Sequence, residues 1–132
     1  MSDFRGGVIP AEIADFIVDR IGSVAELEGL LILRRDPQTK WSAQALAARL
    51  YVPASNAEEM LRLLCKNGFA AAVGSQPPLY SYRPESSELE SNVDRLAALY
   101  SAHLVAVTGL IHSKARQRVQ GFADAFRFRK DD

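Results

Sequence analysis

Two short helical segments followed by two strand-like segments constrain the fold of this chain more than any other feature. Residues 43–50 form a run rich in alanine and leucine behind Ser42, a suitable N-cap. The turn Tyr51-Val-Pro-Ala54 interrupts this run, and the capping box Ser55-Asn-Ala-Glu58 predicts a second helix over 55–67. The order therefore predicts two helices joined by a four-residue turn.

The residues after the second helix predict a β-hairpin. Gly68 suits the left-handed conformation that ends a helix. The apolar run Phe69–Val73 is typical of a strand, and the loop Gly74–Pro78 cannot continue a helix. The alternating run Leu79–Tyr82 predicts the return strand, which Pro84 ends.

Two further helices are predicted before this region. The first begins near Pro10, a residue favoured in a first turn, and ends before Gly22. The second opens at a capping box over 23–26 and ends at Asp36-Pro37. Both segments repeat apolar residues at helical spacing, so each is expected to bury one face.

The C-terminal third carries a longer helical pattern. A capping box, Ser87-Glu-Leu-Glu90, opens it, and apolar positions then follow at steps of four and three, the spacing of a coiled-coil seam. The pattern predicts one helix of about 25 residues, with an end or a kink expected at Gly109 or over 111–113, followed by a final helix over about 115–127. We expect the seam to pair two chains into a homodimer; the alternative is packing against the chain's own first helices. The seam consists of Leu89, Val93, Leu96, Tyr100, His103, Val107 and Leu110.

Charge and hydropathy limit the possible partners. The 132 residues include 16 basic and 16 acidic side chains, so the formal net charge is zero, which excludes a polycation and an acidic DNA mimic. No apolar run approaches the roughly 20 residues that a membrane helix needs, and the first residues do not resemble a signal peptide. A single cysteine, Cys65, indicates a reducing compartment. We expect a cytoplasmic protein without membrane contact.

No residue set predicts catalysis or metal binding. The sequence contains neither a phosphate-binding glycine loop nor a nucleophile elbow. His103, His112 and the distant Cys65 do not have the spacing of a metal site. Cys65 is expected to be a small buried residue rather than a redox switch. We therefore expect no enzyme activity and no cofactor.

Three segments together resemble a known fold: Trp41–Leu50, Ser55–Phe69 and Tyr80–Pro84. They resemble the winged helix-turn-helix of bacterial transcriptional regulators of the MarR and PadR type. The resemblance implies a mainly α (α+β) protein with a two-stranded wing. It implies three parts: an N-terminal helix over 1–22, a winged helix-turn-helix domain over 23–84, and a C-terminal helical dimerisation arm with a basic tail over 85–132.

The resemblance also implies a function, a small regulator that binds double-stranded DNA as a homodimer. The helix over 55–67 would lie in the major groove. Its apolar side chains would face inward, while Arg62 would read a base or a phosphate and Lys66 would meet phosphate. The residues expected to contact DNA are Ser55, Asn56, Glu59, Arg62, Leu63, Lys66 and Arg83.

The same fold also serves as a protein-binding module, which is the alternative function. Glu58 and Glu59 repel phosphate, and the wing loop Gly74–Pro78 has no basic residue. On this interpretation the chain is an adaptor that does not bind DNA. The basic tail Arg127-Phe-Arg-Lys130 would serve either function, by touching DNA phosphates or by docking a protein.

Overall fold

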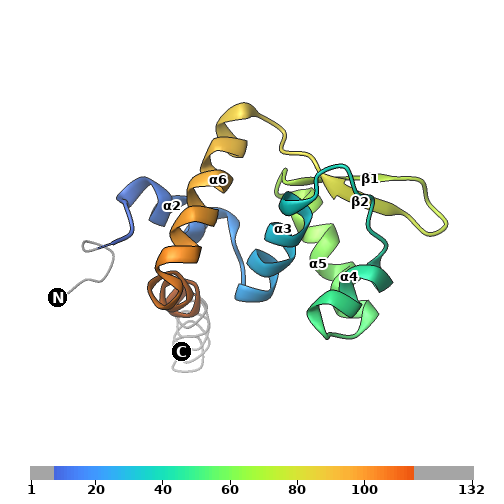
Figure 1. Cartoon of the computed structure of the whole chain (residues 1–132), viewed down its shortest axis with the longest axis horizontal. Helices are drawn as coiled ribbons and strands as arrows, with labels where there is room; N and C mark the ends of the chain where they lie inside the picture. The colour runs from blue at the N-terminus through green and yellow to red at the C-terminus, as the bar shows by residue number, and fades with distance from the viewer. Residues whose placement is uncertain (1–7, 115–132) are drawn as a thin grey trace, which may run out of the picture. The chain divides into compact units, whose positions relative to one another are not determined.

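The structure, a computed structural model, describes residues 8–114, which form two compact units (Figure 1). One unit contains the chain up to Val24 together with the chain from Leu99 onward, and the other is Ala25–Ala98. The second unit holds the predicted helix-turn-helix and hairpin, so this unit positions the candidate site. The predicted helix over 115–127 and the basic tail lie outside the described residues.

The second unit is built around a winged helix-turn-helix, which confirms the predicted α+β fold. Its strands pair antiparallel, beginning with Ala70 opposite Tyr82, and Figure 1 shows this hairpin extending beyond the helices as a wing. Trp41 adds an isolated antiparallel bridge to Tyr80. The elements follow in the order α3 (Val24–Arg35), α4 (Ala43–Leu50), α5 (Ala54–Lys66), β1 (Ala70–Val73) and β2 (Leu79–Tyr82).

Local chemistry explains where the two central helices begin. Ser42 caps α4 as predicted, because its Oγ accepts a hydrogen bond of 3.0 Å from the backbone N–H three residues on. The predicted capping box at Ser55 is wrong. α5 begins one residue earlier, directly after Pro53, whose extended backbone precedes the helix and whose carbonyl accepts the Asn56 N–H at 3.0 Å. Ser55 therefore lies inside the first turn.

The core of this unit depends on close approach between helices. The apolar face of α5 is buried as predicted, and α3 comes so near that a Cβ at Gly29 would lie 2.6 Å from Met60 Sδ. Gly68 has φ +86°, the left-handed conformation expected of a helix end, and it places Phe69 in the core. The buried residues of α5 are Ala57, Met60, Leu61 and Leu64.

The first unit contains α2 (Ala11–Arg20), the last residues of α6 (Ser87–Ala102) and the helix Leu104–Lys114. α2 follows Pro10 and stops before Gly22, as predicted. Lys114 is buried, and its Nζ donates a 2.8 Å hydrogen bond to the carbonyl of Ile21, directly after α2. An ammonium group at a helix C-terminus interacts favourably with the last carbonyls. The buried apolar residues of this unit include Ile13, Phe16, Ile17, Ile21, Val107, Leu110 and Ile111.

The predicted C-terminal helix of about 25 residues is too long, because the chain bends at His103 rather than at Gly109 or over 111–113. α6 (Ser87–Ala102) has 16 residues, and the next helix starts at Leu104, so the chain bends at His103. A second correction concerns the cap of α6, because Ser86 rather than Ser87 accepts the capping hydrogen bond. The bend has a physical reason: the residues beyond it bury their apolar face within the chain instead of extending into solvent.

The seam residues are therefore mostly covered within one chain. His103 is exposed at the bend, whereas the other six side chains are at least nine-tenths buried. The burial of these six side chains matches the alternative prediction, in which the seam packs inside the chain. That the seam pairs two chains stays a prediction. The six buried residues are Leu89, Val93, Leu96, Tyr100, Val107 and Leu110.

Between residues 8 and 114, no single helix is both long and apolar enough to cross a bilayer. α6 and Leu104–Lys114 meet those limits only when they are counted together, and the bend separates them.

Candidate nucleic-acid interface

The polar face of α5 is open to solvent, as the sequence predicted. Its apolar positions are buried at helical spacing, so the side chains on the opposite side of the helix point away from the core. Leu63 is half-buried at the edge of this face. The exposed residues among those expected to contact DNA are Ser55, Asn56, Glu59, Arg62 and Lys66.

The exposed face of α5 is close to neutral rather than cationic. Glu58 and Glu59 offset Arg62 and Lys66, and all four side chains are exposed. Arg62 Nη2 lies 3.4 Å from Glu59 Oε1, one helical turn away, and each side chain is 62% exposed. An exposed pair of this kind contributes about 0.2–1 kcal/mol. The guanidinium that is expected to meet DNA is therefore held by a neighbouring carboxylate.

The wing carries its charge at its base rather than at its tip. Arg83 directly follows β2, is exposed, and donates its backbone N–H to the Phe69 carbonyl at 2.9 Å. This hydrogen bond places Arg83 near the C-terminal end of α5, away from the loop over 74–78. The loop residues from Gly74 to Pro77 are exposed and uncharged. The structure thus brings Arg83 near the Lys66 end of α5 and not near Ser55.

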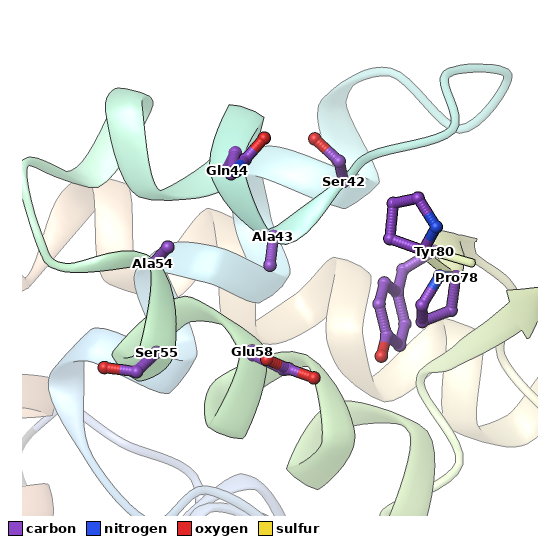
Figure 2. Close-up of a pocket in the computed structure, with 9 residues that line it drawn as sticks. Ser42, Ala43, Gln44, Ala54, Ser55, Glu58, Pro78 and Tyr80 are labelled. Carbon is purple, nitrogen blue, oxygen red and sulfur yellow. The ribbon is translucent and has the colours of Figure 1, made fainter. Parts of the chain in front are cut away.

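A cavity of about 300 Å³ lies where the first turns of α4 and α5 meet the wing. Figure 2 shows Ala43 pointing into it and Glu58 extending from α5 in the direction of the Tyr80 ring. The cavity has one carboxylate and no basic residue, so it disfavours a phosphate and suits a hydrogen-bond donor such as a base amino group. Its lining residues are Ser42, Ala43, Gln44, Ala54, Ser55, Glu58, Pro77, Pro78 and Tyr80.

The pKa values of one phenol and one thiol near the cavity are raised. Burial raises the pKa of the Tyr80 phenol, and the nearby Cys65 and Glu58 raise it further. Burial also raises the pKa of the Cys65 thiol, which is half-buried on α5. A protonated thiol is a weak nucleophile. Across residues 8–114 no three His, Cys, Asp or Glu side chains gather in a way that could hold a metal ion.

Sequence reasoning missed two features of this surface. The cavity could not be predicted, because three segments that are separate in the sequence form it. The sequence predicts only an interruption between helices at Tyr51, yet the side chain of this residue is 94% exposed. The sequence did carry a signal for this exposed side chain: a large aromatic residue stands at the end of a predicted helix, where glycine is common.

Comparison with known proteins gives a likeness in fold. A homodimeric winged helix-turn-helix DNA-binding domain of Mycobacterium bovis, a possible ArsR-family transcriptional regulator, aligns with a TM-score of 0.52 and 17% identity, over 79% of this chain and 91% of that domain. This likeness supports the winged helix-turn-helix fold of the chain.

Two structures of MarR regulators also align. The multiple antibiotic-resistance repressor MarR of Listeria monocytogenes gives a TM-score of 0.48 and 17% identity, over 96% of this chain and 88% of that chain. A MarR family transcriptional regulator of Streptomyces coelicolor gives a TM-score of 0.49 and 19% identity, over 92% of this chain and 89% of that chain. No family model and no curated protein sequence matches this chain.

Proposed function

We propose that this chain is a DNA-binding transcriptional regulator that places α5 in the major groove. The observation that carries the proposal is the polar face of α5, which stands exposed beside the wing of a winged helix-turn-helix. A helix fits the major groove of B-form DNA, and its exposed side chains then reach base edges. The similar Mycobacterium bovis domain is described as DNA-binding.

Each residue expected to contact DNA has a role in this proposal. Arg62 reads a guanine edge or meets a phosphate, after it leaves Glu59. Asn56 lies in the first turn and reads a base edge, and Ser55 beside it contacts the backbone. Lys66 and Arg83, at the other end of α5, meet phosphates. The Glu59 carboxylate accepts a hydrogen bond from a cytosine amino group. Leu63 packs beside Glu59.

We further propose that the regulator acts as a homodimer, with two copies of α5 about 34 Å apart. The similar Mycobacterium bovis domain is described as homodimeric. The described residues also leave an apolar surface open next to His103, where Leu104 is 53% and Val105 is 81% exposed. We propose that this surface joins the predicted seam in the dimer contact. Such a regulator would work in a bacterial cytoplasm without a catalytic step.

The alternative function is a protein-binding adaptor, and one observation favours it. The exposed face of α5 carries as many carboxylates as cations. DNA affinity depends mainly on neutralising phosphates, whereas a protein partner can match a surface of mixed charge. The two functions therefore differ in the salt dependence of binding.

The test is the affinity of the purified full chain for labelled duplex DNA, measured by fluorescence anisotropy from about 50 to 200 mM salt. A regulator should bind random duplex at low salt and lose affinity along a log-log line, whose slope counts the phosphates met. Selection of bound fragments from a random pool then gives the preferred site. An adaptor should bind neither the random duplex nor any fragment of the pool.

Arg62→Ala is the informative variant, and Arg95→Ala is its matched control. Arg62→Ala should weaken binding to the selected site by about 1–3 kcal/mol. Arg95 is also exposed but lies on α6, so its loss changes net charge equally without touching the proposed interface. If Arg62→Ala and Arg95→Ala lose the same affinity for DNA, Arg62 is not part of the interface. If the unmodified chain does not bind DNA, the proposed function is wrong.

A further inference from the structure

The cavity between the first turns of α4 and α5 and the wing has the size of a small-molecule site. Its volume is about 300 Å³, and protein pockets for small molecules range from about 300 to 1,000 Å³. Alanine is the first residue of both helices, Ala43 in α4 and Ala54 in α5, and a larger side chain at either position would take up part of this space. All nine lining residues belong to the unit Ala25–Ala98, so one compact unit forms the whole cavity.

Glu58 gives the cavity a negative charge that the described residues do not neutralise. It is the one charged residue in the lining, and its side chain is exposed. Arg62 lies one turn further along α5 but pairs with Glu59 instead. Within residues 8–114 no ion pair joins a cation to Glu58. The Glu58 carboxylate is therefore free to meet a cation that comes from outside the chain.

The wall opposite α5 is largely apolar and aromatic. The wing contributes Pro77, Pro78 and the ring of Tyr80, and Figure 2 shows Glu58 extending towards this ring. An aromatic ring attracts cations through its electron-rich face. A bare metal ion needs several protein ligands, and no three metal-ligating side chains gather within the described part of the chain. A single carboxylate beside an apolar and aromatic wall instead matches a cation that carries its own apolar body.

We propose that this cavity binds a small organic cation, an ammonium group on an apolar body, with the Glu58 carboxylate as its counter-ion. The ammonium group lies against Glu58 and beside the Tyr80 ring, and the apolar body lies against the alanines and prolines of the wall. A hydrogen bond between two charged groups is about twice as strong as one between neutral groups. The cavity should therefore prefer an ammonium compound to an alcohol of the same shape.

The experiment is an NMR titration of the full chain with phenethylammonium, followed through the backbone amide signals of the cavity. Phenethylammonium should shift the signals of Ala43, Gln44 and Ser55, with a Kd of about 1 mM or lower. Phenethyl alcohol has the same apolar body without the charge, and it should bind about fivefold more weakly. Phenylacetate should not bind, because Glu58 repels its carboxylate.

Two variants test the charge and the space of the cavity separately. Glu58→Gln should weaken phenethylammonium binding about tenfold, the lower end for a hydrogen bond to a charged group because Glu58 is exposed, and should leave the binding of phenethyl alcohol unchanged. Ala43→Leu should block both compounds, because Ala43 points into the cavity (Figure 2). The matched controls are Glu88→Gln on α6 and Ala45→Leu on α4, which replace exposed residues outside the cavity and should bind like the unmodified chain.

Three results would overturn the cation site. They are no shift of the cavity signals at about 10 mM phenethylammonium, equal affinity for phenethylammonium and phenethyl alcohol, and undiminished phenethylammonium binding by Glu58→Gln. The titration contains no DNA, so its result is separate from that of the DNA-binding assay. A chain that binds phenethylammonium but no duplex keeps the cation site while the proposed function fails, and the opposite pair of results removes the cation site alone.

Discussion

Replacing Glu59 by glutamine should make this protein bind random duplex DNA more tightly. Glu59 lies on the exposed face of α5, and its Oε1 is 3.4 Å from Arg62 Nη2. In the proposed complex this carboxylate has two effects. It repels the phosphates on either side of the groove, and it holds the guanidinium that should meet them. Glu59→Gln removes both effects and nearly preserves the shape of the side chain.

The magnitude follows from the geometry of the pair. Unit charges 3.4 Å apart attract by about 1 kcal/mol in water, and measured exposed pairs contribute about 0.2–1 kcal/mol. Because both side chains are 62% exposed, the lower part of that range applies. A phosphate about 8 Å from the carboxylate adds about 0.5 kcal/mol of repulsion before screening. Together these give about 0.5–1 kcal/mol, or about two- to fivefold in affinity.

The assay is fluorescence anisotropy with a random duplex at about 50 mM salt, repeated at about 200 mM, where screening should shrink the gain. Glu88→Gln is the matched control, because Glu88 is exposed on α6 and its loss changes net charge equally. The selected site adds a second readout. If Glu59 accepts a hydrogen bond from a cytosine in the selected site, Glu59→Gln should lose the preference for that base pair. The same variant should still bind random duplex more tightly.

One result would refute this reasoning. If Glu59→Gln and Glu88→Gln bind random duplex with the same affinity, Glu59 neither restrains Arg62 nor approaches the phosphates. The exposed face of α5 would then not be the surface that meets DNA.

Three further predictions concern stability, measured as the free energy of unfolding in denaturant. Ser42→Ala should lower it by about 1 kcal/mol through the lost cap, whereas Ser55→Ala should change it by less than about 0.5 kcal/mol. Gly29→Ala should lower it by about 1–3 kcal/mol, because the new methyl group would overlap Met60 Sδ; an unchanged value would show that the thioether moves aside freely. Burial and the nearby Asp94 and Glu90 raise the pKa of Tyr82 to about 12. The fold therefore favours the neutral phenol, stability should fall as pH rises from about 10 towards 12, and Tyr82→Phe should reduce that fall.

Local sequence predicted the elements of the winged helix-turn-helix well, because their signals lie within a few residues. Ser42 caps α4 and Gly68 ends α5 in the left-handed conformation, both as expected. The same local reasoning was wrong at Ser55, where Pro53 set the start of the helix instead. Two competing signals lay two residues apart, and the geometry of proline prevailed over a serine cap.

Predictions that depended on what lies next to a helix were less complete. The heptad spacing correctly identified an apolar seam, but spacing alone does not say whether the seam is covered by the same chain or by another. The break at His103 follows from burial beyond it. For the site, periodicity found the exposed face of α5, yet it did not show that Glu59 would pair with Arg62 or that Arg83 would lie at the base of the wing.

The sequence by itself determined the order of helices and strands and the residues that α5 turns towards solvent. These depend on backbone propensity, capping and periodicity, which act over a few residues. The tertiary structure decided that Glu58 enters a cavity with Tyr80, that Gly29 meets Met60, and that Tyr51 stands free at the turn. Such features arise when segments distant along the chain pack together, and burial then depends on neighbours that no short stretch of sequence specifies.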